Sequence, residues 1–254
     1  MHDITLIQFL IVCPLVGIAG FVDAVAGGGG LISLPAYLIA GLPPHNAIAT
    51  NKMSSTFGTS LTTARFIRSG LISFRLAVPS VLAAVIGSSI GAHLSLLISE
   101  AVMKYILFAV LPVSAFFVLN KQFFGDGGTA EVTLDRKTYL TAAVSAFLIG
   151  IYDGFYGPGT GTFLIIAFTV FARMSVSTAN AQAKVINLTT NVTSLLIFLK
   201  NGQVILSLGL AAAACNMLGN YIGSGLVMAK GGKIARPIIL GVLFLLLLKV
   251  LGVY

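Results

Sequence analysis

Hydrophobic residues follow one another along this chain in long blocks, separated by short polar stretches. Most blocks have about 20 residues, the length that a helix needs to cross about 30 Å of hydrocarbon. They do not alternate between polar and apolar positions as barrel strands do. The pattern therefore predicts an all-α polytopic membrane protein. Of the ten segments given next, the seventh is too short to span the membrane comfortably. We place ten hydrophobic segments, near residues 4–20, 22–41, 46–68, 74–98, 102–120, 138–154, 159–173, 177–199, 204–229 and 234–253.

Composition supports this class of protein. Apolar residues make up 57% of the chain, charged residues 9%, and the mean hydropathy is +1.02. These values lie far outside the range of soluble domains. Most of the chain must therefore lie in lipid.

One polar linker divides the chain near its middle. Residues 121–138 hold six of the 22 charged residues (15 Lys and Arg plus 7 Asp and Glu). The sequence thus predicts a first transmembrane repeat at 1–120, a linker at 121–138 and a second repeat at 139–254.

The two halves resemble each other along their length. Asp23 aligns with Asp153 at an offset of 130, and after a two-residue insertion Lys52 aligns with Lys184 at an offset of 132. The same offset carries the GxxxG motif at 87–91 onto the one at 219–223. Small residues at this spacing let helices approach closely, so we assign the glycines of both motifs to packing. Such internal repeats are typical of transporters.

The positions of Lys and Arg predict the topology, because cytoplasmic loops collect these residues. If all ten segments cross, ten basic residues fall on one side and only Lys104 and Lys200 on the other. The repeat would then be inverted, with five crossings in each half and both termini outside. If segments 2 and 7 are re-entrant instead, the same residues divide almost evenly. The ten basic residues that share one side when all segments cross are Arg65, Arg68, Arg75, Lys121, Arg136, Lys137, Arg173, Lys230, Lys233 and Arg236.

Each half has an aspartate followed by a glycine-rich break. Asp23 precedes Gly27, Gly28, Gly29 and Gly30, and Asp153 precedes Gly157, Gly159, Thr160 and Gly161. A helix broken at such a point exposes free N–H groups and the positive end of its dipole, which favours an anion. Irregular backbone at membrane depth is tolerated around a polar cavity. Alternatively, the glycines only allow helices to cross closely.

The helix after each break carries a polar stripe. The spacing of 3, 4 and 3 residues in both halves puts each set on one helix face. A lysine followed by hydroxyl and amide groups suits a small oxyanion in a dry pocket. Alternatively, the lysines snorkel and the polar groups join helices. The stripes are Lys52, Ser55, Thr59 and Thr62, and Lys184, Asn187, Asn191 and Ser194.

Asp23 and Asp153 allow two interpretations from the sequence. They are partners of the lysines or caps of the broken helices, or they take up protons and couple transport to the proton gradient. The residues themselves favour neither interpretation.

Two stretches carry a resemblance to a known family. The segments "FVDAVAGGGGLISLPAYLIAGLPPHNAIATNK" and "GIYDGFYGPGTGTFLIIAFTVFARMSVSTANAQAKVINLTTN" resemble the two signature halves of the TauE/SafE family, bacterial sulfite-exporter-like membrane proteins. The resemblance implies a multi-pass carrier of the bacterial inner membrane that moves sulfite or small sulfonates, usually outward. It also implies a site at the glycine turns Gly27–Gly30 and Gly157–Gly161, with Asn51, Lys52, Lys184 and Asn187. "GPGTG" replaces "GGGG" in the second half, so the two half-sites differ.

From these observations we expect a transporter that uses alternating access between its halves, and the resemblance implies that it exports its cargo. We expect a small anionic substrate, a lipid bilayer and a homo-oligomer as partners, with no cofactor, metal or nucleic acid. An anion channel and an importer of another small organic anion are the alternatives. We do not expect an enzyme, because Asp23 and Asp153 have no Ser-His or His-cluster arrangement beside them.

Overall fold

The computed structural model describes residues 4–103, 105–106 and 134–230. Its described part is helical, as predicted, and contains no strand. Most of the predicted segment 102–120, segment 234–253 and linker residues 121–133 lie outside the described residues. The helices are α1 (Leu6–Ala26), α2 (Gly30–Ile39), α3 (Pro44–Arg68), α4 (Phe74–Leu97), α6 (Arg136–Phe155), α7 (Thr160–Val170), α8 (Val176–Lys200) and α9 (Leu206–Lys230).

Three of the described helices, α1, α4 and α6, are long and apolar enough to cross a membrane. Helices α3 and α8 have 25 residues each, but their polar stripes lower their hydropathy. The side chain of Asp135 caps α6 by accepting a hydrogen bond from the backbone N–H of Thr138 at 2.8 Å. Helix α6 therefore begins at Arg136, within the stretch that the sequence assigns to the linker.

The first helix ends at the predicted glycine-rich break and not at the boundary between the first two predicted segments. The predicted boundary near residue 21 is wrong, because α1 continues through Asp23 to Ala26 and ends where Gly27 adopts a left-handed φ of 72°. Gly20 does not end the helix because it gives close contact with α9, where a Cβ would overlap the carbonyl oxygen of Asn216. Asp23 thus lies in the last turn of α1 and not at the start of a second segment.

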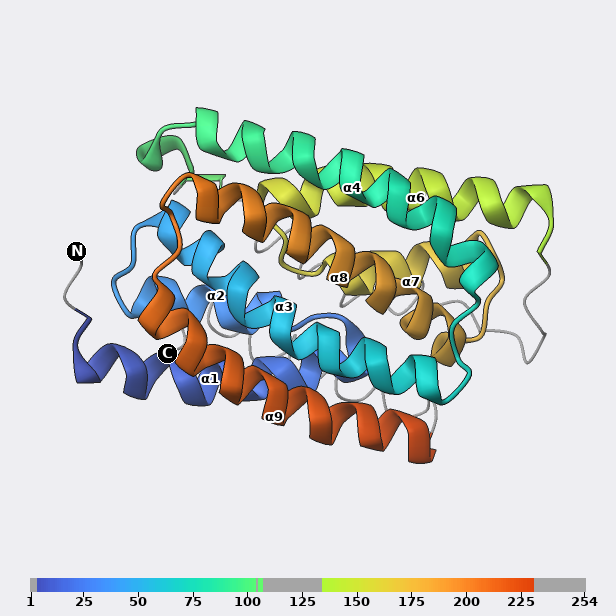
Figure 1. Ribbon diagram of the computed structural model, residues 1–254, viewed down its shortest axis with the longest axis horizontal. Helices are drawn as coiled ribbons and strands as arrows, with labels where there is room; N and C mark the ends of the chain where they lie inside the picture. Colours follow the sequence, from blue (N-terminus) through green and yellow to red (C-terminus); the bar gives the residue numbers. More distant parts are fainter. Residues whose placement is uncertain (1–3, 104, 107–133, 231–254) are drawn as a thin grey trace.

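The short helices α2 and α7 have 10 and 11 residues. At about 1.5 Å per residue each reaches about half of the hydrocarbon thickness. Neither helix is therefore long enough to cross the hydrocarbon by itself, although the neighbouring helices begin at the ends that crossing of all ten segments predicts (Figure 1). Figure 1 shows that α1 and α3 begin at the same end of the bundle, so α2 turns back toward the end where α1 starts. Helix α7 turns back beside α6 in the same way.

The helices form a layered bundle (Figure 1). Helices α4 and α6 pack together on one side, α1 and α9 pack together on the opposite side, and α2, α3, α7 and α8 lie between them. The GxxxG glycines allow the two helices of each outer pair to approach closely. A Cβ on Gly87 would overlap the carbonyl oxygen of Phe147 on α6, and a Cβ on Gly219 would overlap that of Gly17 on α1. The predicted packing role is confirmed for these motifs.

Polarity in this bundle is the reverse of that in a soluble protein. The outer helices expose large apolar side chains, as a lipid-facing surface requires. The central helices bury their polar residues, including both stripe lysines, at 2% exposure for Lys52 and 0% for Lys184. The chain is a membrane protein by this arrangement. Exposed apolar residues include Leu10, Ile18, Val78, Leu82, Ile86, Leu140, Leu148, Leu210, Leu218 and Ile222.

Helix lengths recur in the same order in the two halves. Helices α1 to α4 have 21, 10, 25 and 24 residues, and α6 to α9 have 20, 11, 25 and 25. The first half begins at one end of the bundle and α6 begins at the other (Figure 1). Both observations favour the inverted repeat, which stays a prediction. The strongest packing, α4 with α6 and α1 with α9, joins one half to the other.

Candidate functional site: a polar cavity between two helix breaks

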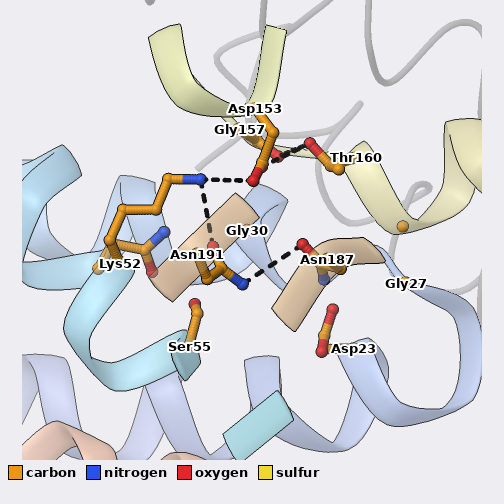
Figure 2. A pocket seen from close by; sticks show the side chains of 13 residues that line it. Asp23, Gly27, Gly30, Lys52, Ser55, Asp153, Gly157, Thr160, Asn187 and Asn191 are labelled. Atoms are coloured by element: carbon orange, nitrogen blue, oxygen red, sulfur yellow. Dashed lines mark hydrogen bonds and ion pairs between the residues drawn. The ribbon is translucent and has the colours of Figure 1, made fainter. Parts of the chain in front are cut away.

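A polar cavity lies at the centre of the bundle, between the two helix breaks (Figure 2). The space among its lining atoms is about 300 Å³, including the part that opens to solvent. Both halves of the chain contribute to its lining. The lining residues are Asp23, Gly27, Gly30, Asn51, Lys52, Ser55, Asp153, Gly157, Gly159, Thr160, Gly161, Asn187 and Asn191.

The glycines bring the two breaks into direct backbone contact. Gly27 lies against Gly161, where a Cβ on Gly161 would come within 2.5 Å of the Gly27 Cα, and Gly30 lies against Pro158. Gly157 and Gly159 have φ of 101° and 87°, a region that only glycine adopts without strain. The glycines therefore do allow the helices to cross closely, as the alternative interpretation from the sequence proposed. It does not compete with a cavity role, because Gly27 and Gly161 also line the cavity.

Two helix N-termini point into this region. Helix α2 begins at Gly30 and α7 begins at Thr160, and both residues line the cavity. The first-turn N–H groups of a helix have no acceptor within that helix, and its N-terminus carries a partial positive charge. The breaks thus place two positive helix ends on one small space, as the sequence predicts.

Lys52 reaches into the cavity from α3 and pairs with Asp153 of the second half (Figure 2). The Nζ of Lys52 lies 2.8 Å from Oδ2 of Asp153, and each side chain is 2% exposed. Lys52 also donates a hydrogen bond to Oδ1 of Asn191 at 3.2 Å. The hydroxyl of Thr160 donates to the other carboxylate oxygen of Asp153 at 2.7 Å. Asp153 therefore links the start of α7 to the lysine of α3.

Lys184 on α8 pairs in the same way with Asp23 of the first half. Its Nζ lies 2.7 Å from Oδ2 of Asp23 and also donates to the carbonyl oxygen of that residue. Lys184 is fully buried and does not line the cavity, whereas the Asp23 side chain is 13% exposed and does. Each lysine is therefore a partner of the aspartate in the other half. Proton uptake by the aspartates stays a prediction.

The two pairs make the site electrically neutral before a ligand enters. Two lysines and two aspartates carry a formal sum of zero, so the site does not present the free positive charge that the sequence alone suggested. A buried charge without a partner costs several kcal/mol. An anion that binds Lys52 must therefore compete with a carboxylate or arrive with a compensating positive charge.

Most of the predicted site residues come together in the cavity. Asn51, Ser55 and Asn187 face it beside Lys52. Four predicted residues do not line it: Gly28, Gly29, Thr59 and Lys184. Gly29 instead packs on α1, where a Cβ would lie 2.5 Å from the Cβ of Asp23. Thr59 is fully buried, and its hydroxyl has no hydrogen-bond partner among the described residues.

Two polar residues beside the site were not singled out from the sequence. Asn180 on α8 donates from Nδ2 to the carbonyl oxygens of Ala24 and Val25, at 3.0 and 3.2 Å. The hydroxyl of Thr162 on α7 donates to the carbonyl oxygen of Ala26 at 2.9 Å. The spacing of Asn180, four residues before Lys184 and hence on the same helix face, is the signal that could have found it.

Comparison with known proteins places the chain in a family. The family model for the sulfite exporter TauE/SafE matches residues 12–250. The chain belongs to the TauE/SafE family. It is therefore a member of a membrane transporter family, as the resemblance implies.

Relatives within the TauE/SafE family are named as probable transporters. The chain is 36% identical to the probable membrane transporter protein ORF9 of Sinorhizobium sp, over 99% of this chain and 95% of that protein. It is 35% identical to the probable membrane transporter protein YfcA of Escherichia coli K12, over 87% and 81%. A probable membrane transporter protein of Haemophilus influenzae is also 35% identical, over 91% and 90%. No solved structure matches this TauE/SafE chain.

Proposed function

We propose that this protein is a multi-pass carrier of the bacterial inner membrane that exports a small sulfur-containing oxyanion, sulfite or an organosulfonate. The observation that carries the proposal is the central polar cavity, which combines Lys52 with the N-termini of α2 and α7. A lysine supplies charge, and helix N-termini supply N–H donors directed at an anion. The matching family model bears the description sulfite exporter, which supports this choice of cargo.

The roles of the cavity residues follow from their positions. Lys52 attracts the anion, the N–H groups at Gly30 and Gly161 cradle it, and the polar groups of Ser55 and Asn187 orient it. Binding sites between two repeats near the bilayer midplane are typical of alternating-access carriers. Access to the two sides alternates as one half moves against the other.

The proposed orientation follows from the basic residues. One end of the bundle holds the C-terminal ends of α3 and α9 together with the N-terminal ends of α4, α6 and α8 (Figure 1). This end carries Arg65, Arg68, Arg75 and Arg136, whereas the opposite end carries Lys200 at the end of α8. Because cytoplasmic loops are rich in Lys and Arg, we assign the arginine-bearing end to the cytoplasm.

Neutrality of the empty site gives a reason for coupling to protons. An anion that replaces Asp153 at Lys52 leaves a buried carboxylate without its partner, which is costly. A proton taken up with the anion removes this cost. Export of one negative charge with one proton thus keeps the cavity neutral throughout the cycle.

The test is uptake of labelled sulfite into proteoliposomes, with and without an imposed pH gradient. We expect gradient-dependent flux in the wild type and loss of flux in Lys52→Ala and in Lys184→Ala, while size-exclusion profiles show folded protein. Lys200→Ala is the matched control, because Lys200 is exposed at the end of α8. It is expected to transport normally.

Each of the other outcomes contradicts a definite part of the proposal. Full transport by both alanine variants at the two buried lysines would remove the site. Absence of sulfite flux in the wild type would remove sulfite as the cargo, and the same vesicles would then be tested with taurine and with small carboxylates. Flux without counterflow of labelled substrate would indicate a channel in place of a carrier.

A further inference from the structure

Two hydroxyl groups on the polar stripes are buried without a hydrogen-bond partner in the described part of the chain. They belong to Thr59 on α3 and Ser194 on α8, and both residues are 0% exposed. A buried hydroxyl without a partner costs about 1–3 kcal/mol. An apolar side chain of similar size would avoid this cost at either position, so packing alone does not account for the two hydroxyls.

Other fully buried hydroxyls of these two helices have partners. Thr62 donates to Oδ1 of Asn220 at 2.7 Å, and Thr190 donates to the carbonyl oxygen of Asn187 at 3.0 Å. Both threonines are also 0% exposed. Burial at this depth therefore does not by itself deprive a hydroxyl of a partner, and the two unpaired hydroxyls are exceptions.

Each unpaired hydroxyl lies one helical turn from the cavity. Thr59 is four residues after the cavity residue Ser55, and Ser194 is three residues after the cavity residue Asn191. At these spacings two side chains share one helix face and are about 4.5–6 Å apart along the helix axis. The two polar stripes thus continue past the cavity lining, along α3 in one direction and along α8 in the other.

The two hydroxyls lie on opposite sides of the cavity because the two helices run in opposite directions. Helix α3 runs toward the arginine-bearing end of the bundle, and α8 runs away from it (Figure 1). The helices meet at the cavity, where Lys52 donates to Asn191. Thr59 follows Lys52 on α3 and so lies toward the arginine-bearing end. Ser194 follows Asn191 on α8 and so lies toward the opposite end.

The helices that carry these hydroxyls favour anions along their length. Neither α3 nor α8 contains an aspartate or a glutamate. Each ends in basic residues, Arg65 and Arg68 on α3 and Lys200 on α8. A hydroxyl donates its hydrogen to an acceptor, and the oxygens of a sulfite or a sulfonate are acceptors. The hydroxyls therefore suit an oxyanion that moves between the cavity and a basic helix end.

We infer that Thr59 and Ser194 are two anion subsites that flank the cavity, and that they open toward opposite faces of the membrane, Thr59 toward the arginine-bearing end. The inference rests on the proposed function, because it gives an alternating-access carrier one further subsite on each side of its central site. Both subsites are closed in the structure, since neither residue is exposed. Each hydroxyl gains an acceptor when its side opens and the cargo passes.

The test measures how fast a thiol at each subsite reacts with a membrane-impermeant methanethiosulfonate that carries a sulfonate group. Thr59→Cys and Ser194→Cys are made separately in the full chain with Cys13→Ser and Cys215→Ser, which removes both native cysteines. The reagent is applied to one face at a time of sealed membrane vesicles of known orientation.

Two exposed reporters identify the faces. Ser69→Cys lies at the end of α3, and Asn201→Cys lies at the end of α8. Labelling times are limited to those at which only the reporter on the treated face reacts, so transport of the reagent does not blur the result. Thr59→Cys should react only from the face of Ser69→Cys, and Ser194→Cys only from the other face. Each should react about 10- to 1,000-fold more slowly than its reporter, as expected for a site that opens in a minor conformer.

Thr62→Cys and Thr190→Cys are the matched controls, because these residues are as deeply buried on the same two helices but have partners. Each should react more slowly than the subsite thiol on its own helix. The inference is overturned if neither subsite thiol reacts, if both react from the same face, or if the controls react equally fast.

A second arm adds methanesulfonate, which does not react with the reagent. It should slow both subsite thiols and leave both reporters unchanged. Unchanged rates at both subsites, in a protein that transports labelled sulfite, would overturn the inference and leave the proposed function intact. If the protein transports neither sulfite nor methanesulfonate, the proposed cargo fails. The labelling without ligand still decides whether the two positions open on opposite faces, so the two failures are distinguishable.

Discussion

Removal of the Lys52 charge is the perturbation whose result follows most directly from the structure. Lys52→Met keeps the length and apolar stem of the side chain but leaves Asp153 buried without its partner. The two groups lie 2.8 Å apart, and each side chain is 2% exposed, so water does not replace the lost charge. Removal of one partner of such a pair costs about 3–5 kcal/mol.

The double variant Lys52→Met/Asp153→Asn tests the reason for this loss. The amide oxygen introduced at position 153 can still accept from Thr160, whose hydroxyl donates to Asp153 at 2.7 Å in the native protein. Neither buried charge remains, so the double variant should be more stable than Lys52→Met by about 1–3 kcal/mol, in spite of its second substitution.

Thermal unfolding in detergent, without ligand, measures these differences. For a chain of this size about 1 kcal/mol corresponds to about 2–4 °C, so Lys52→Met should lower the Tm by about 6–20 °C. Lys200→Met, an exposed control at the end of α8, should change the free energy of unfolding by less than about 0.5 kcal/mol. The single variant Asp153→Asn completes the set. The reasoning is refuted if the loss of unfolding free energy in the double variant equals the sum of the losses in Lys52→Met and Asp153→Asn to within about 0.5 kcal/mol, because independent sites add in that way.

Two further predictions concern helix packing and a helix cap. Gly219→Val should destabilise the protein by about 1–3 kcal/mol or more, because a Cβ there overlaps the backbone of Gly17. The control is Gly41→Asn, at a left-handed φ of 84° with open space around it. It should cost less than about 1 kcal/mol in the same unfolding assay. Equal losses would contradict this packing argument. The backbone N–H of Thr138 holds the pKa of the Asp135 carboxyl below its ordinary value, so the cap stabilises α6 above about pH 4 and is lost as the pH falls through the lowered value. The amide resonance of Thr138 should report this loss, and Asp135→Asn, which keeps a capping oxygen without a titrating group, should abolish the pH dependence.

Much of the site could be predicted because the responsible features are local in sequence. The spacing of Lys52 and Ser55, and of Asn187 and Asn191, follows helix periodicity, so each stripe lies on one helix face wherever that helix packs. Repetition of the pattern in both halves indicated that the faces meet. All residues that line the cavity belong to the predicted set, and whether they bind the substrate stays a prediction.

Other features could not be predicted because they depend on contacts between distant segments. The end of α1 at Ala26 depends on Gly20 packing against α9 and on donors from α7 and α8. The difference between the lysines depends on the same packing, since Lys184 is closed off behind the α1 end. Local composition treats Gly20 and Gly27 alike as helix breakers, although only Gly27 ends the helix.

By itself, the sequence determined that this is a helical membrane protein with two similar halves, each with a broken helix and a polar stripe. Block length, composition and periodicity suffice for this, because lipid requires every spanning segment to satisfy its own backbone. Only the tertiary structure decided that each lysine pairs with the aspartate of the other half, and that Lys52 lines the cavity while Lys184 does not. Pairing of buried charges depends on which helices become neighbours, and packing of side chains across the whole bundle determines these neighbours.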